Sequence, residues 1–464
     1  MRAVIKHGAV ALAGVLVLSA CSVGPDYARP VAAAPAARFL RGQGLEAAPA
    51  APWWTGLGDA GLNGLIEQGL TNAPQMSAAQ ARVRQARAGL RNARAGQWPA
   101  LGADAGYLHA DLPGFGAGDF FNTGFDAQWE IDIWGGKRRG VEQARAQLAV
   151  VEAQRGDAEV SLAAEIARTY VTLRAREASR SLLAQRHEVE AGLVRIAGEK
   201  LAAGTNVRQT LEGARATLSR TEGEQAAVAA DIAALRDALA VLTGQAPGAL
   251  DGLGAGAVPL PPEVLALGDP GAMLARRPDV RAAERAYAGA TAGVGVAMAR
   301  RYPTVSLMGV IGLGGTKAGD AIDPSSFASV IAPTLRWNFP SFGRVEAGVQ
   351  SARGARDLAL AQYQGAVLAA LQDAESALGR FGAARVSWAR SGAAAGHGAE
   401  IARLQAMRGA AGTLGQGDVL AARRDAINAR LAQENDRASM TLAYVALSKA
   451  LGLGWGTQSA KAGG

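Results

Sequence analysis

The feature that most constrains this sequence is a run of 67 residues, from Lys137 to Ala203, that contains no proline. The run is dense in Ala, Leu, Glu, Arg and Gln, which favour the α-helix, and only four glycines interrupt it. As one helix it would be about 100 Å long at a rise of 1.5 Å per residue. Because this length exceeds the diameter of a small domain, the chain cannot form an ordinary globular core around it.

The rest of the chain repeats the same design. All eighteen prolines lie outside residues 114–246 and 341–464. A shift of 204 positions places residues 74–99 on residues 278–303 with nine identities in 26 positions, and both terminal prolines are among them. Further along, a shift of 208 aligns Gly204-Thr205 with Gly412-Thr413. We therefore interpret the chain as a tandem duplication.

Between the helical stretches, the period of the apolar residues changes from 3.6 to 2. Phe125, Ala127 and Trp129 alternate with Asp126 and Gln128, which is typical of a strand with one apolar face. We expect four strands, at about 100–112, 122–134, 303–314 and 326–339. We expect a loop rich in glycine and phenylalanine, residues 112–121, to join the first two.

Proline and polar residues mark two local features. Pro333 removes a backbone donor from the last strand, so we expect a bulge or a weak hydrogen bond there. The first long helix reverses at Ala203-Gly204-Thr205, where glycine permits a tight turn. We expect Thr205 or Asn206 to cap the returning helix.

The amino terminus has the pattern of a secretory signal. Arg2 and Lys6 precede an apolar run, which ends in Leu18-Ser19-Ala20-Cys21. This ending resembles a bacterial lipobox, in which cleavage leaves the cysteine as an acylated first residue. Cys21 is the only cysteine, so it can form no internal disulfide. We predict lipid attachment at Cys21, and the alternative is a chance cysteine at the end of a signal peptide.

The charge pattern and the reactive residues indicate no enzyme. The net charge of +8 would permit nucleic-acid binding, but arginines alternate with acidic residues along the helices, as on a solvated helical surface. The four histidines are far apart and have no metal-ligand spacing. No catalytic Ser/His/Asp or Cys/His set stands out. We therefore expect no catalysis, no cofactor, no metal site and no nucleic-acid partner.

These patterns divide the chain into six parts. We expect a lipoprotein signal peptide (1–20), a lipidated extended segment (21–58), a first structural repeat (59–244) with a helix hairpin (137–244), an inter-repeat segment (245–272) without stable elements, a second repeat (273–452) with a hairpin (343–452), and a flexible carboxyl-terminal tail (453–464).

The strands have the length needed to cross a bilayer when tilted. Four strands cannot close a barrel, and open edges are not tolerated in hydrocarbon. Three chains would supply a 12-stranded barrel, and their helix hairpins would form a hollow cylinder below it. We therefore expect a membrane α/β fold, in which each duplicated protomer contributes four strands to a 12-stranded trimeric β-barrel and long helices to an α-helical barrel across the periplasm; the resemblance of the amino terminus to sorted lipoproteins implies that the membrane is the outer membrane. The alternative is a small soluble sheet at one end of a helical rod.

The sequence also resembles a known family. The matching stretches are Cys21 to Pro30, Trp53-Trp54 with Asp59, Leu62, Leu65-Ile66 and Asn72, Arg277 to Glu284, and Gly412-Thr413 with Asp418-Val419-Leu420. As a set they resemble the TolC-like outer-membrane channels of tripartite efflux systems, in particular the NodT-type lipoprotein branch. The resemblance implies a homotrimer in the outer-membrane lipid. It also implies a periplasmic adaptor and an inner-membrane pump of the RND type as partners.

The resemblance implies two kinds of site at the periplasmic end. Asp418 matches an aspartate of the family's periplasmic gate, whereas an ordinary helix-capping role is the alternative. A second acidic gate position is Ala421, and the positions of an Arg-to-Asp latch are Leu414 and Thr210, so packing is expected to hold the gate. The two turns, Ala203-Gly204-Thr205 and Ala411-Gly412-Thr413, match the family's adaptor contacts, although a helix reversal alone would also explain their glycines.

We therefore expect an outer-membrane channel that passively conducts drugs or other small molecules. A protein-secretion conduit of the type I systems shares every structural feature above. A lipid-anchored periplasmic coiled-coil scaffold is a further alternative, but it would not need amphipathic strands.

Overall fold

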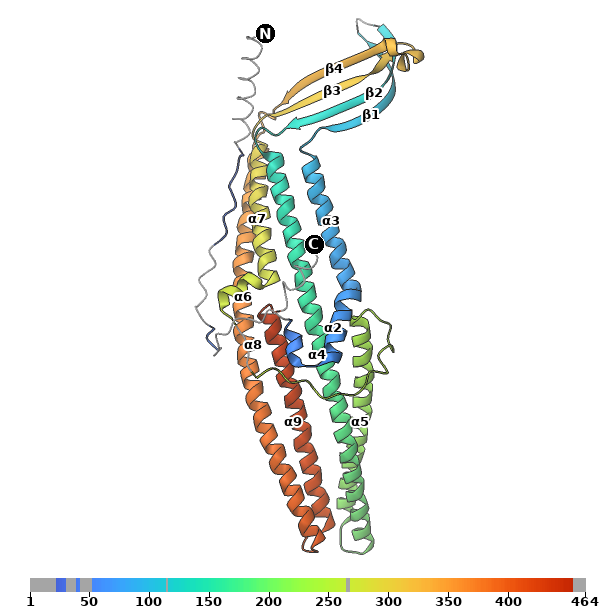
Figure 1. Cartoon of the computed structure of the whole chain (residues 1–464), viewed down its shortest axis with the longest axis vertical. Coiled ribbons are helices and arrows are strands. Elements are labelled where there is room, and N and C mark those ends of the chain that lie inside the picture. The colour runs from blue at the N-terminus through green and yellow to red at the C-terminus, as the bar shows by residue number, and fades with distance from the viewer. Residues whose placement is uncertain (1–21, 31–38, 42–51, 114–115, 264–267, 454–464) are drawn as a thin grey trace. The chain divides into compact units, whose positions relative to one another are not determined.

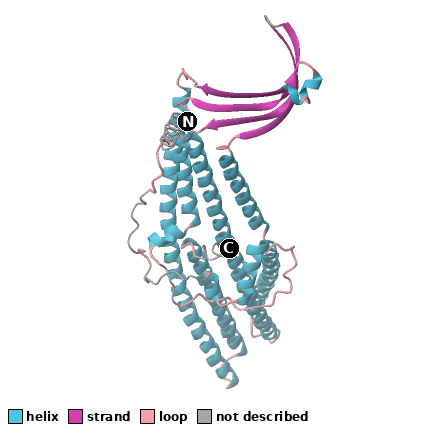
Figure 2. Cartoon of the chain, turned by 45° about the horizontal axis from the view of Figure 1, so that its top comes forward, coloured by secondary structure: helices cyan, strands magenta, loops and turns pink. Residues whose placement is uncertain are grey.

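The fold combines long helices with one four-stranded sheet (Figure 1, Figure 2). We analysed a computed structural model that describes residues 22–30, 39–41, 52–113, 116–263 and 268–453. Its helices are η1 (Trp53–Leu57), α2 (Ala60–Asn72), α3 (Pro74–Ala95), α4 (Gly136–Ala202), α5 (Arg208–Leu242), α6 (Pro270–Arg276), α7 (Pro278–Ala299), α8 (Arg344–Ala410) and α9 (Gln416–Ala450). Its strands are β1 (Ala100–Leu112), β2 (Gly116–Ile131), β3 (Thr304–Gly315) and β4 (Phe327–Arg336), with short turns η2 (Ala318–Ala321) and η3 (Pro324–Ser326) between the last two.

Two compact units share these elements. The strand unit comprises Met1–Ala32, Ala81–Ala153 and Arg281–Ala366, and the hairpin unit comprises Ala33–Gln80, Gln154–Val280 and Val367–Gly464. Each unit contains parts of both sequence repeats, because the division falls inside α3, α4, α7 and α8. None of the helices in the described ranges is both long and apolar enough to cross a membrane.

The helices confirm the duplication. The predicted long helix is α4, and its counterpart α8 has the same length of 67 residues. The returning helices α5 and α9 both have 35 residues, and α3 and α7 both have 22. Equal lengths in the two copies agree with repeats that differ mainly in the strand region.

The sheet is antiparallel throughout, in the order β1-β2-β3-β4. The predicted loop at residues 112–121 is wrong, because β1 continues to Leu112 and β2 already begins at Gly116. Side chains across this pair explain the extra length. Tyr107 packs on Phe121 with ring centroids 4.9 Å apart, and its hydroxyl donates to Asp119.

The ends of two strands also differ from the prediction. β2 ends at Ile131 instead of residue 134 because the carboxylate of Asp132 accepts the backbone N–H groups of Lys137 and Arg138 and so caps the start of α4. β4 ends at Arg336 instead of residue 339. The expected bulge at Pro333 is wrong, because the register with β3 continues through it without interruption. As β4 lies at an edge of the sheet, a missing backbone donor is tolerated there.

The inter-repeat segment is irregular but firmly packed within the hairpin unit. Val258 is completely buried against Val171 and Ala175 of α4 and Ala438 of α9. The hydroxyl of Thr441 donates to the carbonyl of Pro259 at 2.7 Å. The segment therefore crosses from one helix hairpin to the other.

Candidate functional site

The turn of the first hairpin contains the predicted tip residues Ala203, Gly204 and Thr205. Gly204 has φ +70°, and the N–H of Thr205 donates to the carbonyl of Lys200 at 2.9 Å. The hydroxyl of Thr205 donates to the same carbonyl at 3.0 Å. Thr205 thus closes the end of α4 and does not cap α5, which corrects the predicted cap. Val207 occupies the cap position and has no side-chain cap bond.

The turn of the second hairpin has the same geometry. Gly412 has φ +73°, and both the N–H and the hydroxyl of Thr413 donate to the carbonyl of Arg408, at 2.9 and 3.0 Å. Ala411, Gly412 and Thr413 are exposed, as are their counterparts in the first turn. A Cβ atom added to either glycine would meet no atom within 4 Å. The two turns are therefore equivalent protruding surfaces, which lie at the same end of the hairpin unit (Figure 1).

Asp418 lies in the first turn of α9, close to the second tip. Its side chain is exposed, and its N–H donates to the carbonyl of Gly415 at 3.1 Å. A carboxylate in this first turn also interacts favourably with the helix dipole. Both Leu414 and Ala421 are partly buried.

An apolar seam joins the two hairpins above the tips. Leu182 and Val189 of α4 form a buried cluster with Ile427 of α9, and Leu193, Leu420 and Leu431 pack against it. The helices approach closely at Gly192, where an added Cβ would lie 2.9 Å from Cδ1 of Leu420. The contact between the hairpins therefore rests on apolar packing along α4 and α9.

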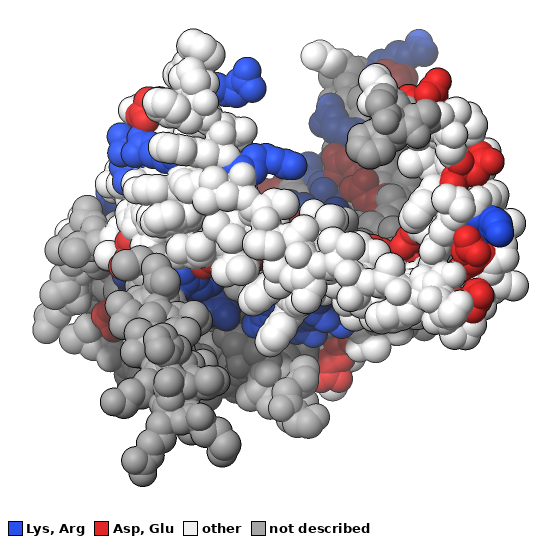
Figure 3. Space-filling view, turned by 90° about the horizontal axis from the view of Figure 1, so that it is seen from above, with Lys and Arg blue, Asp and Glu red and all other residues white. Residues whose placement is uncertain are grey.

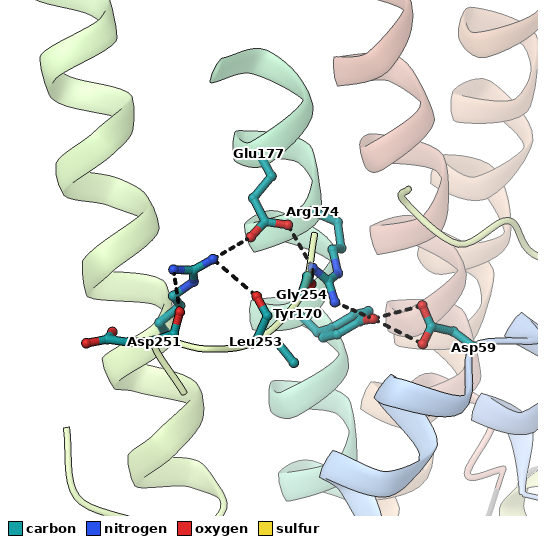
Figure 4. Close-up of polar contacts among 8 residues, drawn as sticks. Asp59, Tyr170, Arg174, Glu177, Asp251, Leu253 and Gly254 are labelled. Atoms are coloured by element: carbon teal, nitrogen blue, oxygen red, sulfur yellow. Dashed lines mark hydrogen bonds and ion pairs between the residues drawn. The ribbon is translucent and has the colours of Figure 1, made fainter. Parts of the chain in front are cut away.

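A buried polar network anchors the inter-repeat segment to α4 and α5 (Figure 4). Arg174 donates to Glu177 at 2.7 Å, and Arg236 of α5 donates to the other oxygen of the same carboxylate at 3.1 Å. The two arginines also donate to backbone carbonyls of the segment, those of Asp251, Leu253 and Gly254. Sequence analysis missed this network because Arg174 and Glu177 have the same spacing as the exposed pair Glu165 and Arg168.

Through Tyr170, the same network also extends to Asp59 at the start of α2. The hydroxyl of Tyr170 lies 2.9 and 3.0 Å from the carboxylate oxygens of Asp59, and it accepts from Arg174 at 3.0 Å. Asp59 also caps α2 by accepting the N–H of Leu62. Burial raises the pKa of Tyr170. This network positions four segments of the hairpin unit around one buried carboxylate and two guanidinium groups.

Directly paired residues point to the same side of the sheet. The register gives the sheet one apolar face, and an opposite face that is polar on β1 and β2 but also carries apolar residues of β3 and β4, such as Met308 and Val330. On the apolar face, Phe125, Ile311 and Phe327 are all more than half exposed. They line a shallow concavity of about 550 Å³. The opposite face carries Asp104, Asn122, Asp126, Gln128 and Glu130. A sheet of this kind needs an apolar medium on one side and water on the other.

Residues 22–30, which we call the strap, run along helices α4 and α7 of the strand unit. The N–H of Val23 donates to the carbonyl of Trp134 at 3.1 Å. Arg139 is buried under the strap and donates to Asp26 at 2.6 Å. The hydroxyl of Tyr27 donates to Glu284 at 2.6 Å. Burial, and then this hydrogen bond to a carboxylate, raise the pKa of Tyr27.

One predicted site residue remains outside these observations. Cys21 lies outside the described residues, so its lipid attachment stays a prediction. In the part of the chain that the structure describes, no group of three or more His, Cys, Asp or Glu residues could hold a metal ion.

Comparisons with known proteins agree with this architecture. The family model of the outer membrane efflux proteins matches residues 65–245 and 270–453, one match for each repeat. The pyoverdine export outer membrane protein OpmQ of Pseudomonas aeruginosa is 29% identical over 394 residues, which cover 78% of this chain and 79% of that protein. The outer membrane protein OprJ of the same organism is 27% identical over 471 residues, which cover 97% and 96%.

A solved structure shows the same similarity in three dimensions. The outer-membrane channel OprN superposes with a TM-score of 0.85 and 30% sequence identity, covering 94% of this chain and 100% of that chain. Duplicated long helices, an open-edged amphipathic sheet and a family match over both repeats lead to one conclusion. The chain belongs to the outer membrane efflux protein family.

Proposed function

We propose that this protein is the outer-membrane channel of a tripartite efflux system and passively conducts small molecules to the cell exterior. The observation that carries the proposal is a four-stranded sheet with an exposed apolar face and two open edges. Because hydrocarbon cannot satisfy open edges, β1 of one copy must pair with β4 of another. Three copies would give a closed 12-stranded barrel whose polar face lines a pore.

This proposal is tested with the purified full chain in mild detergent and in planar lipid bilayers. We expect a complex of three chains and ion conductance after insertion. A monomer that conducts no ions, or protein that salt alone removes from membranes, would contradict the channel function. The latter result would favour the coiled-coil scaffold.

We propose a periplasmic adaptor and an RND-type inner-membrane pump as partners, with the helix tips as adaptor contacts. The equivalent exposed geometry of the two turns supports this assignment. Gly412→Trp adds a bulky side chain where no atom lies within 4 Å of the Cβ position, so it meets no steric clash in the turn, although the φ of +73° strains any residue other than glycine. The matched control is Gly412→Ala, which has the same backbone strain without the bulk. We expect efflux to be lost only in Gly412→Trp, and intact efflux in both variants would leave the tip as a simple turn.

We propose Asp418 as a residue of the periplasmic gate. Its exposure beside the tip supports a ring of three carboxylates, which would favour cations in a narrow opening. Asp418→Ala is expected to weaken cation preference, or block by multivalent cations, in bilayer recordings. The control Glu212→Ala removes an exposed carboxylate of the first hairpin instead. An unchanged Asp418→Ala channel would leave only the helix-capping role.

We propose that acylated Cys21 anchors the chain in the membrane. The bond from Val23 to the carbonyl of Trp134 supports this, since it holds the strap where β2 leads into α4. Two or three acyl chains would anchor stably, where one would be marginal. Radiolabelled palmitate should label the wild type and not Cys21→Ser. Equal labelling would place the lipid elsewhere.

We propose small molecules as the cargo. The names of the relatives support this cargo, since they include a pyoverdine export protein, cation efflux proteins and a fusaric acid resistance protein. A protein-secretion conduit is the alternative. Deletion of the gene should increase sensitivity to small toxic compounds, whereas loss of a secreted protein with unchanged sensitivity would favour the alternative.

A further inference from the structure

The strand ends next to the helices carry a belt of tryptophans that the backbone holds in place. The indole N–H groups of Trp129, Trp134 and Trp337 donate to the carbonyls of Gln97, Pro303 and Arg301, at 2.9, 2.8 and 3.2 Å. Each acceptor belongs to a segment that joins a helix to a strand. Trp134 stacks on Tyr302 with ring centroids 4.5 Å apart, and Trp337 stacks on Phe339 at 5.1 Å.

Several aromatic rings at this level remain on the surface, including Trp98 in the segment that joins α3 to β1. Trp98, Trp337 and Phe339 are 73%, 54% and 74% exposed. A ring whose N–H is satisfied and whose apolar body is exposed fits the interface between membrane and water. The tryptophan belt therefore marks the level at which the sheet leaves the hydrocarbon.

Basic residues gather at the same level. The segments 91–99, 128–139, 298–305 and 334–346 contain nine Lys or Arg residues and three acidic residues. Five of these basic residues either form ion pairs or lie on the polar face of the sheet. Lys137, Arg138, Arg139 and Arg301 pair with carboxylates, and Arg336 lies on the polar face with Thr334.

Four exposed arginines remain: Arg91, Arg94, Arg300 and Arg344. They have no ion-pair partner among the residues that the structure describes. Arg91 and Arg94 lie in the last two turns of α3, Arg300 directly follows α7, and Arg344 begins α8. We call these four residues the arginine collar.

The opposite end of the sheet has the reverse charge. The hairpin ends carry Asp111, Asp119, Asp320 and Asp323, against the single cation Lys317. Figure 3 shows acidic side chains gathered at this end and uncharged surface along the sheet. The sheet is therefore polarised along its strands, with four acidic residues and one lysine at the hairpin ends and the basic residues gathered at the tryptophan belt.

We propose that the arginine collar binds the anionic headgroups of phospholipids, such as phosphatidylglycerol, in the periplasmic leaflet. This inference rests on the proposed membrane channel. Guanidinium groups recognise phosphate oxygens, and basic residues beside an apolar surface attract anionic lipids. A solvated charge run would not coincide with a belt of tryptophans.

The test uses the full chain, reconstituted in bilayers of phosphatidylcholine or phosphatidylglycerol. Brominated lipids quench the fluorescence of tryptophans that they contact, so the belt reports which lipid is bound. We expect phosphatidylglycerol to bind about fivefold more strongly than phosphatidylcholine. The ratio should fall toward 1 in Arg94→Gln/Arg300→Gln/Arg344→Gln, which removes three of the four collar arginines, and high salt should reduce it in the wild type.

The matched control is Arg220→Gln/Arg390→Gln/Arg430→Gln. It removes three exposed arginines of the hairpin unit and changes the net charge equally. The control should keep the fivefold preference. Equal binding of both lipids by the wild type, or an unchanged preference in the collar variant, would overturn the inference. Absence of conductance in every lipid would instead contradict the proposed channel function.

Discussion

The close crossing of the strap over α7 allows a sharp prediction from one added methyl group. An added Cβ at Gly295 would lie 2.7 Å from Cγ of Arg139 and 3.0 Å from the carbonyl oxygen of Val23. The backbone of the strap leaves no more room, because a Cβ on Gly24 would lie 2.5 Å from Cα of Gly295. Gly295→Ala should therefore displace the strap.

The magnitude follows from separating two effects. Alanine in place of glycine stabilises a helix by about 1 kcal/mol, but α7 is helical whether the strap is docked or not, so this gain cancels in the docking equilibrium. The contact with Arg139 of α4 is present in both states, whereas the contact with the carbonyl of Val23 exists only in the docked state, and this overpacking against the strap costs about 1–3 kcal/mol. Asp26 is 91% exposed, so weakening its ion pair with Arg139 adds at most about 1 kcal/mol. Docking should weaken by about 2 kcal/mol, or about 30-fold.

Hydrogen exchange of the strap measures this equilibrium directly. The N–H of Val23 is bonded to Trp134, and its exchange rate reports how often the strap opens. We expect exchange in a peptide covering residues 22–30 to accelerate about 30-fold in Gly295→Ala. The control is Gly89→Ala on α3, where an added Cβ meets no atom within 4 Å. Equal strap exchange in Gly295→Ala and the wild type would refute the close crossing.

Three further predictions concern other contacts. Burial, and then the hydrogen bond to Glu284, raise the pKa of Tyr27. Docking of the strap should therefore be complete below the ordinary tyrosine pKa of about 10 and should weaken as the pH rises through the folded-state pKa. The difference in absorbance at 295 nm between the wild type and Tyr27→Phe should show a transition above pH 10, and a transition at or below pH 10 would contradict this prediction. Glu177→Gln leaves Arg174 and Arg236 without their shared carboxylate (Figure 4). The free energy of unfolding measured by denaturant titration should therefore fall by about 3 kcal/mol. A loss below about 1 kcal/mol would indicate that the network is solvated. Gly192→Val should push α4 away from Leu420 of α9 and increase ion conductance in bilayers, whereas unchanged conductance would separate this seam from the gate.

The features that the sequence determined depend on local patterns. A proline-free run of good helix formers has no alternative to a long helix, and this run is α4. The duplication followed from two prolines at equal spacing and from the paired Gly-Thr turns, and the equal helix lengths agree with it. Alternation at period 2 predicted four strands because side chains of a strand point alternately to its two faces.

The features that only the tertiary structure decided depend on residues far apart in the chain. The strand pair extended into the predicted loop because Tyr107 meets Phe121 and Asp119 across it. Packing also determines which of many similar arginine and glutamate pairs are buried, as in the network around Glu177. Such choices arise from long-range contacts, which no local pattern of residues encodes.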